Sequence, residues 1–161
     1  MSQKLVDSLR QEFGDAILAT GSYRGDETVT VGRDRLLDVL RHLRDREGVE
    51  QLSDLAAVDY PRRAERFELN YLLRSWSRNE RLRVKVDVAE DQPVPTASGL
   101  WHSANWAERE VWDMYGIKFS NHPDLRRILL YEEFVGYPLR KDYPKEKRQP
   151  LIRRDHSLPE S

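Results

Sequence analysis

Hydrophobic and polar residues alternate most strictly between residues 67 and 89. In the stretch 81–89 every second position is apolar and most positions between are charged, as expected for a strand with one buried face. The stretch 67–75 alternates well enough for a strand, and Asn79-Glu80 between the two predicts a hairpin turn. The two apolar faces consist of Phe67, Leu69, Tyr71 and Leu73, and of Leu82, Val84, Val86 and Val88.

Three further stretches predict strands: residues 16–23, 27–31 and 49–59. A turn at Arg24-Gly25-Asp26 joins the first two into a hairpin. The third ends at Tyr60-Pro61, because proline cannot continue the hydrogen-bonded ladder of a central strand.

Three stretches predict helices. A first short helix has Leu5, Leu9 and Phe13 on one face and ends at Gly14. A second begins after Asp34 as its N-cap and ends near Gly48, with the apolar stripe Leu36, Leu37, Leu40 and Leu43. A third covers residues 101–116 and ends at Gly116, which suits a left-handed C-cap.

These elements predict an α+β fold: a single domain with a mixed or antiparallel sheet covered by helices on one face. The 161 residues suffice for one such domain with a buried core. Pro123, Gly136, Pro138 and Pro144 exclude a long helix after the third one, yet the chain there stays rich in aromatic and aliphatic residues. We therefore predict a domain at residues 1–118 and an extended, partner-binding C-terminal arm at residues 119–161.

The third helix has an unusual polar face. At ~100° per residue, Val111, Met114 and Tyr115 form an apolar stripe. The other side carries Trp106, Arg109, Glu110 and Asp113, with Glu108 displaced from Glu110 and Asp113. This face is too polar for a domain interior, and Trp and Arg dominate the energetics of protein interfaces. We expect it to contact a partner, with Arg109 and Asp113 close enough to pair across one turn.

Composition excludes several classes of site. The chain has no cysteine, which rules out disulfides, thiolate-bound iron–sulfur clusters, CxxC zinc sites and cysteine nucleophiles. A net charge of −1 gives no bulk attraction to nucleic acid, and residues 126–161, with nine Lys/Arg and six Asp/Glu, are only mildly basic. The start MSQKLVDSL lacks the apolar core of a signal peptide, and no apolar run approaches ~18 residues. We expect a soluble chain that other subunits hold at any membrane.

Catalytic and metal sites find little support. A hydrolase using Glu110, Asp113 or His122 is an alternative, but no nucleophile elbow or accompanying third group is present. The four histidines lack the spacing of metal ligands. Arg126-Arg127 and Arg140-Lys141 suit a partner's carboxylates or carbonyls better than nucleic acid, because no RNP, KH or finger signature accompanies them. We assign no catalytic, cofactor-binding or metal-binding residue.

The stretch 106–144 also resembles a known family signature, that of the 30 kDa subunit of respiratory complex I. Its pattern runs ERE, two residues, D, a hydrophobic and an aromatic residue, G-I-x-F, HP, LRRIL, and later G-H-P-L-R-K-D-aromatic-P. Tyr137 departs from it, because the family usually has histidine there. The matching residues are Glu108, Arg109, Glu110, Asp113, Met114, Tyr115, Gly116, Ile117, Phe119, His122, Pro123, Leu125, Arg126, Arg127, Ile128, Leu129, Gly136, Pro138, Leu139, Arg140, Lys141, Asp142, Tyr143 and Pro144.

The resemblance implies a non-catalytic structural subunit of the peripheral arm of NADH:quinone oxidoreductase, on the cytoplasmic side of the inner or cell membrane. Its implied partners are the quinone-cavity subunit of the 49 kDa type and the terminal iron–sulfur subunits. NADH, FMN, iron–sulfur clusters and quinone would belong to those other subunits. The expected partner-interface residues are Trp106, Glu108, Arg109, Glu110, Asp113, His122, Arg126, Arg127, Arg140, Lys141 and Asp142.

Two rival interpretations remain open beside the hydrolase. A related membrane-bound hydrogenase or ferredoxin-linked complex would use an equivalent subunit. A freestanding assembly factor would present the same surfaces without joining a final complex. In each case, ordering the arm costs roughly 1–2 kcal/mol per residue in backbone entropy, which docking along a partner would offset.

Overall fold

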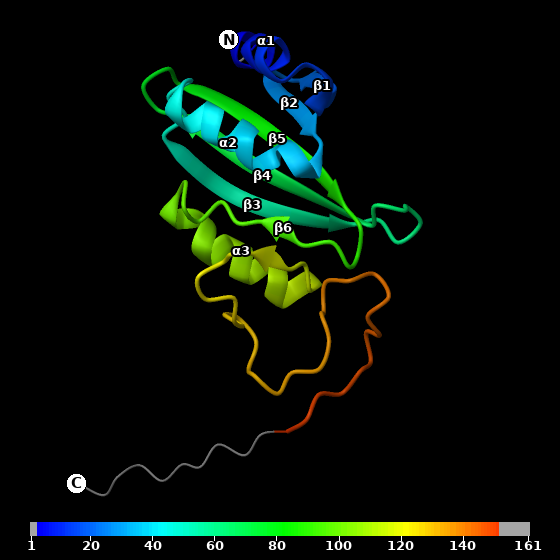
Figure 1. The fold of residues 1–161 in the computed structure, drawn as a ribbon. Coiled ribbons are helices and arrows are strands. Elements are labelled where there is room, and N and C mark those ends of the chain that lie inside the picture. Colours follow the sequence, from blue (N-terminus) through cyan, green and yellow to red (C-terminus); the bar gives the residue numbers. More distant parts are fainter. Residues whose placement is uncertain (1–2, 152–161) are drawn as a thin grey trace, which may run out of the picture.

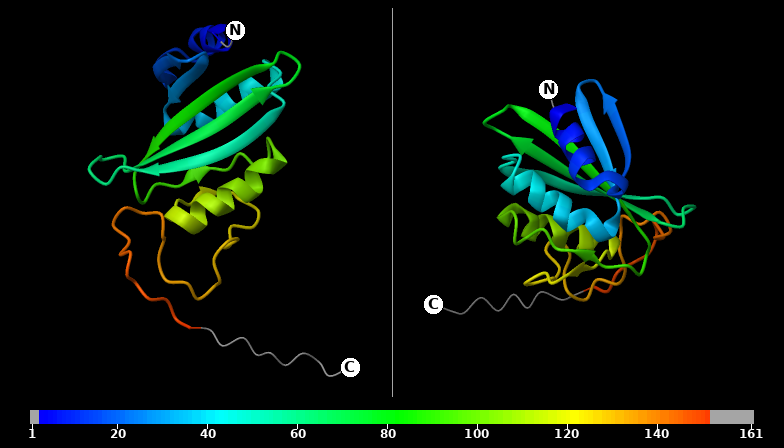
Figure 2. Two further views of the ribbon diagram at one scale, coloured as in Figure 1. Left: turned by 180° about the vertical axis from the view of Figure 1, so that it is seen from behind. Right: turned by 45° about the horizontal axis from the view of Figure 1, so that its top comes forward.

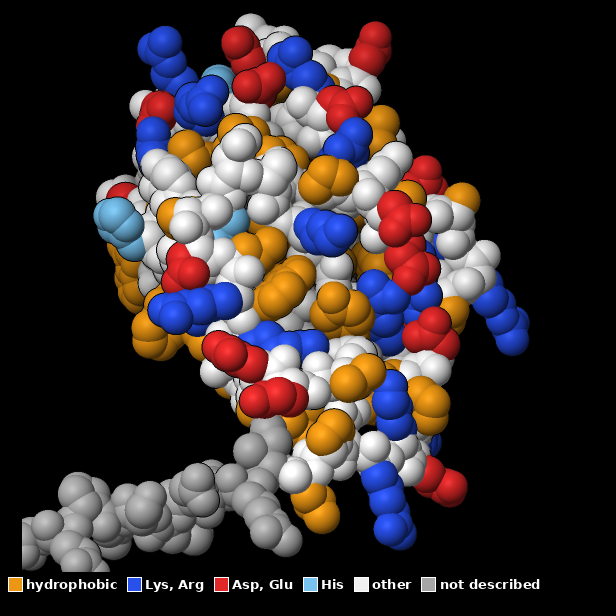
Figure 3. All heavy atoms as spheres, turned by 60° about the horizontal axis from the view of Figure 1, so that its bottom comes forward, with side chains coloured by type: hydrophobic (Ala, Val, Ile, Leu, Met, Phe, Trp, Pro, Cys, Tyr) orange, Lys and Arg blue, Asp and Glu red, His pale blue; other side chains and the backbone are white. Residues whose placement is uncertain are grey.

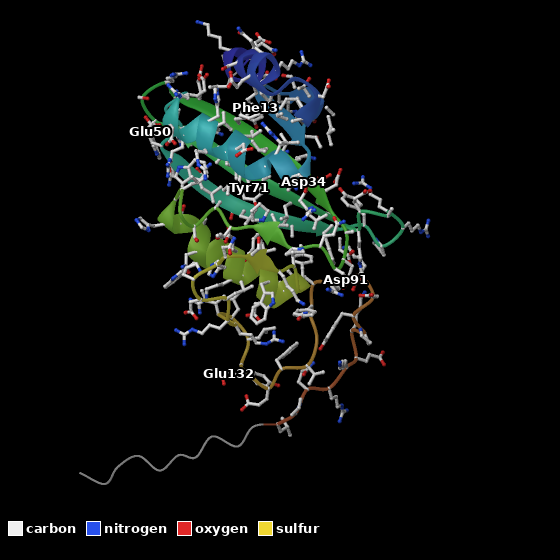
Figure 4. All side chains as sticks on the ribbon, viewed as in Figure 1. Phe13, Asp34, Glu50, Tyr71, Asp91 and Glu132 are labelled. Atoms are coloured by element: carbon white, nitrogen blue, oxygen red, sulfur yellow. The ribbon has the colours of Figure 1, made fainter. Side chains whose placement is uncertain are left out.

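The two strands with the strictest alternation lie at the centre of a five-stranded sheet (Figure 1). The computed structural model describes residues 3–151. β4 (Phe67–Ser75) and β5 (Glu80–Val88) pair antiparallel along their whole length, Phe67 opposite Val88 and Ser75 opposite Glu80. Their predicted apolar faces, which include Tyr71 near the middle of the sheet (Figure 4), are all buried.

The remaining strands make the sheet mixed. Its order is β1-β2-β5-β4-β3, where β1 is Ile17–Tyr23, β2 is Asp26–Val31 and β3 is Gln51–Asp59. β2 runs parallel to β5, and the other neighbouring pairs are antiparallel. A second, two-stranded parallel sheet joins β6 (Val94–Pro95) to β7 (Phe119–Ser120). The predicted α+β fold with a mixed sheet is confirmed.

Three α-helices pack on one side of this sheet and share one hydrophobic core with it (Figures 1 and 2). They are α1 (Gln3–Phe13), α2 (Leu36–Asp45) and α3 (His102–Tyr115). Each contributes apolar residues at helical spacing, for example Leu36, Val39, Leu40 and Leu43 from α2. α3 lies along the edge strand β3, where Ser103 donates a hydrogen bond to the carbonyl of Leu52.

The start of α2 differs from the prediction. Asp34 lies in a short 3-10 turn, Arg33–Arg35, and pairs with Arg33 at 2.9 Å. The N-cap of α2 is Arg35, without a side-chain capping bond, so the assignment of Asp34 as N-cap is wrong. Because the 3-10 turn leads directly into α2, the first turn needs no separate capping side chain there.

The chain after β7 runs below α3 in Figure 1. Residues 121–151 contain no helix or strand. Within the described residues 3–151, no helix combines the length and apolar character needed to cross a bilayer.

Candidate partner interface

The candidate interface consists of α3 and the chain that lies against it. α3 ends at Gly116, whose φ of +78° is left-handed and whose N–H donates to the carbonyl of Trp112 at 2.8 Å. This is the C-cap predicted from the sequence, and it turns the chain back toward the sheet. The carbonyl groups at the end of α3 then become anchor points for residues 127–141.

Asp113 is the centre of the contacts between α3 and the arm. Its side chain is fully buried. Oδ2 accepts hydrogen bonds from the backbone N–H groups of Ile128 (3.2 Å), Leu129 (2.9 Å) and Leu130 (2.9 Å). Oδ1 accepts from Nη1 of Arg127 at 2.6 Å. Burial alone would raise the pKa of Asp113, but these N–H groups and the guanidinium together hold that pKa below its ordinary value.

Two arginines bind the arm through its backbone carbonyls. Arg127 donates from Nη2 to the carbonyls of Phe134 (2.9 Å) and Gly136 (3.3 Å). Arg109 donates to the carbonyls of Arg126 (3.1 Å) and Arg127 (3.2 Å). The predicted Arg109–Asp113 pair is therefore replaced by two longer-range contacts. Guanidinium groups suit this role, because several of their N–H groups can donate at fixed angles at once.

A second cluster of charges fixes the chain near residue 141. Arg140 donates from Nε to the carbonyl of Tyr115 (2.6 Å) and pairs with Glu90. The N–H of Lys141 donates to Oδ2 of Asp59 at 2.7 Å, across 82 positions of sequence. Asp142 and Asp59 both pair with Arg66, at 2.9 Å and 2.8 Å.

The carboxylate of Asp59 is fully buried and joins these groups. The hydrogen bonds from Arg66 are the largest influence on its pKa, which lies below the ordinary value despite burial. Sequence reasoning missed Asp59 and Arg66, since each is a lone charge at the end of a strand or turn. Only the fold brings them beside residue 141.

Glu108 and His122 form a third buried contact. Oε1 of Glu108 accepts the N–H of Ala97 at 2.7 Å, and Oε2 accepts the hydroxyl of Thr96 at 2.5 Å. Nε2 of His122 lies 3.8 Å from Oε2 of Glu108 and donates to the carbonyl of Asn105 at 3.0 Å. Burial raises the pKa of Glu108 to about 7, although the Thr96 and Ala97 hydrogen bonds oppose the shift.

The burial of Glu108, Asp113 and His122 corrects three predicted partner contacts. All three side chains are fully inside the chain, so none is available to a partner. The helical wheel placed Asp113 on an exposed face because it took no account of the arm, which covers that face. Contacts within the chain at Asp113 and Asp59 therefore offset part of the entropy cost that we expected docking along a partner to offset. The division at residue 118 into a domain and a partner-binding arm stays a prediction.

Other predicted residues are accessible. Trp106 is 69% exposed, and Glu110, Arg126, Lys141 and Asp142 are also exposed. Glu110 lines a shallow hollow of about 210 Å³ between α3 and β3, which Leu139 also lines. The predicted partner contacts of these residues stay predictions.

Exposed apolar side chains gather on the side of the molecule formed by α3 and the chain after it (Figure 3). Of the nine large hydrophobic residues exposed within residues 3–151, six lie on α3 or after it. They are Trp106, Leu129, Tyr131, Val135, Leu139 and Leu151. We call the first five the docking face. A concentration of exposed apolar groups among charged ones is typical of a protein-binding surface.

Comparisons with known proteins identify the family of the chain. Residues 29–149 match the family described as "Respiratory-chain NADH dehydrogenase, 30 Kd subunit". The chain belongs to this 30 kDa subunit family. It is 48% identical over 143 residues to an NADH-quinone oxidoreductase subunit of Novosphingobium aromaticivorans. That match covers 89% of the chain and 46% of the relative, so the chain spans about half of that protein's length.

Two solved structures share the fold. One is described as Nqo5 of a trypsin-resistant fragment (1–134); it is 33% identical, with a TM-score of 0.67 over 76% of this chain and 98% of that one. The other belongs to a membrane-bound sulfane sulfur reductase, an archaeal respiratory membrane complex. It is 24% identical, with a TM-score of 0.75 over 90% of this chain and 86% of that one, which shows a common fold.

In this member of the 30 kDa subunit family, much of the matched signature has internal contacts. Asp113 is the acidic residue of the D-hydrophobic-aromatic-G segment. Its carboxylate accepts hydrogen bonds from the backbone N–H groups at the end of the LRRIL segment and just after it. Gly116 also lies against the ring of Tyr137, where a Cβ would come within 2.5 Å of it. Tyr137 stands at the position where the family pattern has histidine, and the guanidinium carbons of Arg127 and Arg140 lie 5.8 Å and 4.9 Å from its ring centroid.

Proposed function

We propose that the chain is a non-catalytic structural subunit of the peripheral arm of NADH:quinone oxidoreductase. That complex transfers electrons from NADH to quinone and couples the transfer to proton translocation. The family assignment supports the choice of complex. The docking face on α3 and the arm is the observation that supports a structural role. The partners we infer are the quinone-cavity subunit and the terminal iron–sulfur subunits.

The chemistry of the chain supports a role without a redox centre of its own. It has no cysteine to supply thiolates to an iron–sulfur cluster. The buried carboxylates of Asp113 and Asp59 accept hydrogen bonds from backbone N–H groups of the arm and form ion pairs with arginines, so they hold the arm in place. NADH, FMN, the clusters and quinone are then bound by other subunits. Those subunits also hold this chain at the cytoplasmic side of the membrane.

Internal anchoring of the arm fits this role better than a disordered arm would. A surface that is already ordered loses less conformational entropy on binding. The arm is bound to its own domain at Asp113 and at Asp59, and Trp106 of α3 and Leu129 of the arm are both exposed. The domain thus presents a preformed apolar surface to its neighbours.

Substitutions on the docking face test the proposal. Trp106→Ser with Leu129→Ser removes two exposed apolar side chains and leaves the buried carboxylates intact. We expect the isolated chain to unfold at an unchanged denaturant concentration. In cells, the variant should be depleted from the membrane complex in native gels, and NADH:quinone activity of the membranes should fall with it. Leu18→Ser with Tyr23→Ser, at exposed positions on β1, is the matched control.

Equal incorporation of both variants into the complex would contradict the assignment of the docking face. A chain of an archaeal membrane-bound sulfane sulfur reductase has the same fold, so the fold alone does not separate NADH:quinone oxidoreductase from the rival hydrogenase-type or ferredoxin-linked complex. The electron donor separates the two. The purified complex containing this chain should oxidise NADH, and oxidation of hydrogen or reduced ferredoxin without NADH oxidation would favour the rival.

A further inference from the structure

The face of the sheet opposite the helices is uncovered. In the left view of Figure 2, β3, β4 and β5 lie in front with no helix across them. Because strand side chains alternate, this outer face carries the residues between the core positions, among them Leu72 and Arg74 of β4 and Arg81, Arg83 and Lys85 of β5.

Three arginines gather at one end of this face. Arg74 lies directly opposite Arg81 and Leu72 directly opposite Arg83 in the β4–β5 register. Directly opposite residues have Cβ atoms roughly 5 Å apart, and diagonal ones roughly 7–8 Å. A hollow of about 430 Å³ is lined by all three arginines and Leu72. We call Arg74, Arg81 and Arg83 the arginine patch.

Within residues 3–151, no Asp or Glu lies within ion-pair distance of the three guanidiniums of the arginine patch. Nε of Arg74 is buried and has no hydrogen-bond partner among those residues. Like charges placed directly opposite on neighbouring strands are destabilising. The cluster therefore costs stability in the isolated chain, and a bound anion would offset that cost.

The carboxylates nearest the patch are few. Asp26 and Glu27 line the same hollow, and the hydroxyl of Ser22 donates to Glu27 at 2.7 Å. Farther along the face, Glu68 forms an ion pair with Lys85 at 2.9 Å. The hollow is thus lined by three arginines without an ion-pair partner and by two carboxylates, so positive side chains outnumber negative ones there.

A tryptophan extends the patch. Trp76 is 57% exposed, and the guanidinium carbon of Arg74 lies 3.7 Å from its ring centroid. The indole N–H donates to Oε1 of Gln51 at 2.7 Å, and the backbone N–H donates to Glu50 at 2.8 Å. These bonds hold the exposed ring in one orientation. Arg and Trp together are the residue types that dominate protein–protein binding energy.

We propose that the arginine patch and Trp76 bind a carboxylate-rich segment of a neighbouring protein. The apolar ring and Leu72 favour a protein segment over a small anion, because they offer contact area that phosphate cannot use. The site lies at the far end of β4 from Phe67, which Arg140 of the arm contacts. At ~3.3 Å per residue, that separation is roughly 20–25 Å. The patch shares no residue with the docking face, although Trp106 of that face lies on α3, whose Ser103 contacts Leu52 near this end of the sheet.

A titration of the full chain tests this surface directly. A hexaglutamate peptide is added to isotope-labelled chain, and backbone amide shifts are followed by NMR. We expect shifts at residues 72–83 that weaken with added salt. Arg81→Gln with Arg83→Gln should raise the dissociation constant about tenfold, the loss expected for two partly exposed Arg–carboxylate contacts. Arg62→Gln with Arg148→Gln removes the same charge from other exposed sites and should leave it unchanged.

Three results would overturn the proposal: no shifts with hexaglutamate, equal weakening by the control variant, or the same shifts at equal concentration of inorganic phosphate. The last would assign the patch to a small anion. Stability gives an independent check. Because the arginines repel one another in the isolated chain, Arg81→Gln alone should unfold at the same or a higher urea concentration than the wild type. A lower midpoint would show that the patch is there to stabilise the sheet.

Discussion

Replacing Asp113 with asparagine should release the arm while leaving the sheet folded. The substitution keeps the shape of the side chain but removes its charge. The carboxylate of Asp113 accepts hydrogen bonds from three backbone N–H groups and from the guanidinium of Arg127. Hydrogen bonds to a charged group contribute about 1.5–3 kcal/mol each, and breaking a buried ion pair costs about 3–5 kcal/mol.

These figures do not add, because the arm can open and expose its groups to water. The amide oxygen of the new side chain also still accepts some of the N–H groups. We therefore expect a loss of about 3 kcal/mol in the free energy that keeps this part of the arm closed. At 1.36 kcal/mol per factor of ten, the opening equilibrium rises roughly 100-fold.

Hydrogen exchange measures this opening at the three amides concerned. In Asp113→Asn, the amides of residues 128–130 should exchange roughly 100-fold faster, and trypsin should cleave after Arg126 or Arg127 correspondingly sooner. Asp124→Asn is the matched control, because this exposed carboxylate of the arm pairs only with the exposed Arg126. It should change exchange at those amides little. Unchanged exchange in Asp113→Asn would refute the assignment of Asp113 as the anchor.

Three further predictions concern the other contacts of the arm and α3. Asp59→Asn should speed exchange of the Lys141 amide at least tenfold, while the amides bound by Asp113 stay protected. Gly116→Ala should lower unfolding stability by about 2 kcal/mol more than Gly48→Ala. Both glycines have positive φ, but a Cβ at position 48 meets nothing within 4 Å. Glu108→Gln should flatten the dependence of stability on pH between 4.5 and 7, as measured by urea unfolding.

The sign of the Glu108 effect follows from its raised pKa. A carboxyl group with a folded-state pKa of about 7 and an unfolded value of 4.5 stabilises the fold fully below pH 4.5. That contribution is lost as the pH rises through 7, and the shift corresponds to about 3 kcal/mol. Glutamine stays neutral throughout. Between pH 4.5 and pH 8, the free energy of unfolding of Glu108→Gln should therefore rise relative to that of the wild type by about this amount. Parallel pH profiles of the two proteins would contradict the buried state of Glu108.

The helices and strands could largely be predicted from the sequence, because each depends on local spacing. β5 is an example: alternation alone gave its bounds within a residue and its buried face. The start of α2 was missed at Asp34, where the 3-10 turn that precedes the helix left no pattern in hydrophobicity.

The polar face of α3 was misread for a different reason. A helical wheel sorts residues into faces but cannot say what covers a face. Asp113 is polar and buried because the arm brings N–H groups and Arg127 to it. Contacts such as Asp59 with the Lys141 amide link positions 82 residues apart and depend on the whole fold. The family signature located the segment that matters, but it did not reveal which of its residues face inward.

The most direct test of the structural role compares the chain alone with the chain in its membrane complex by hydroxyl-radical footprinting. Trp106 and Tyr131 of the docking face should be oxidised readily in the isolated chain. In the complex, both should be protected several-fold, while Leu18 on the edge strand β1 reacts as before. Equal oxidation of Trp106 and Tyr131 in the two states would contradict docking through α3 and the arm.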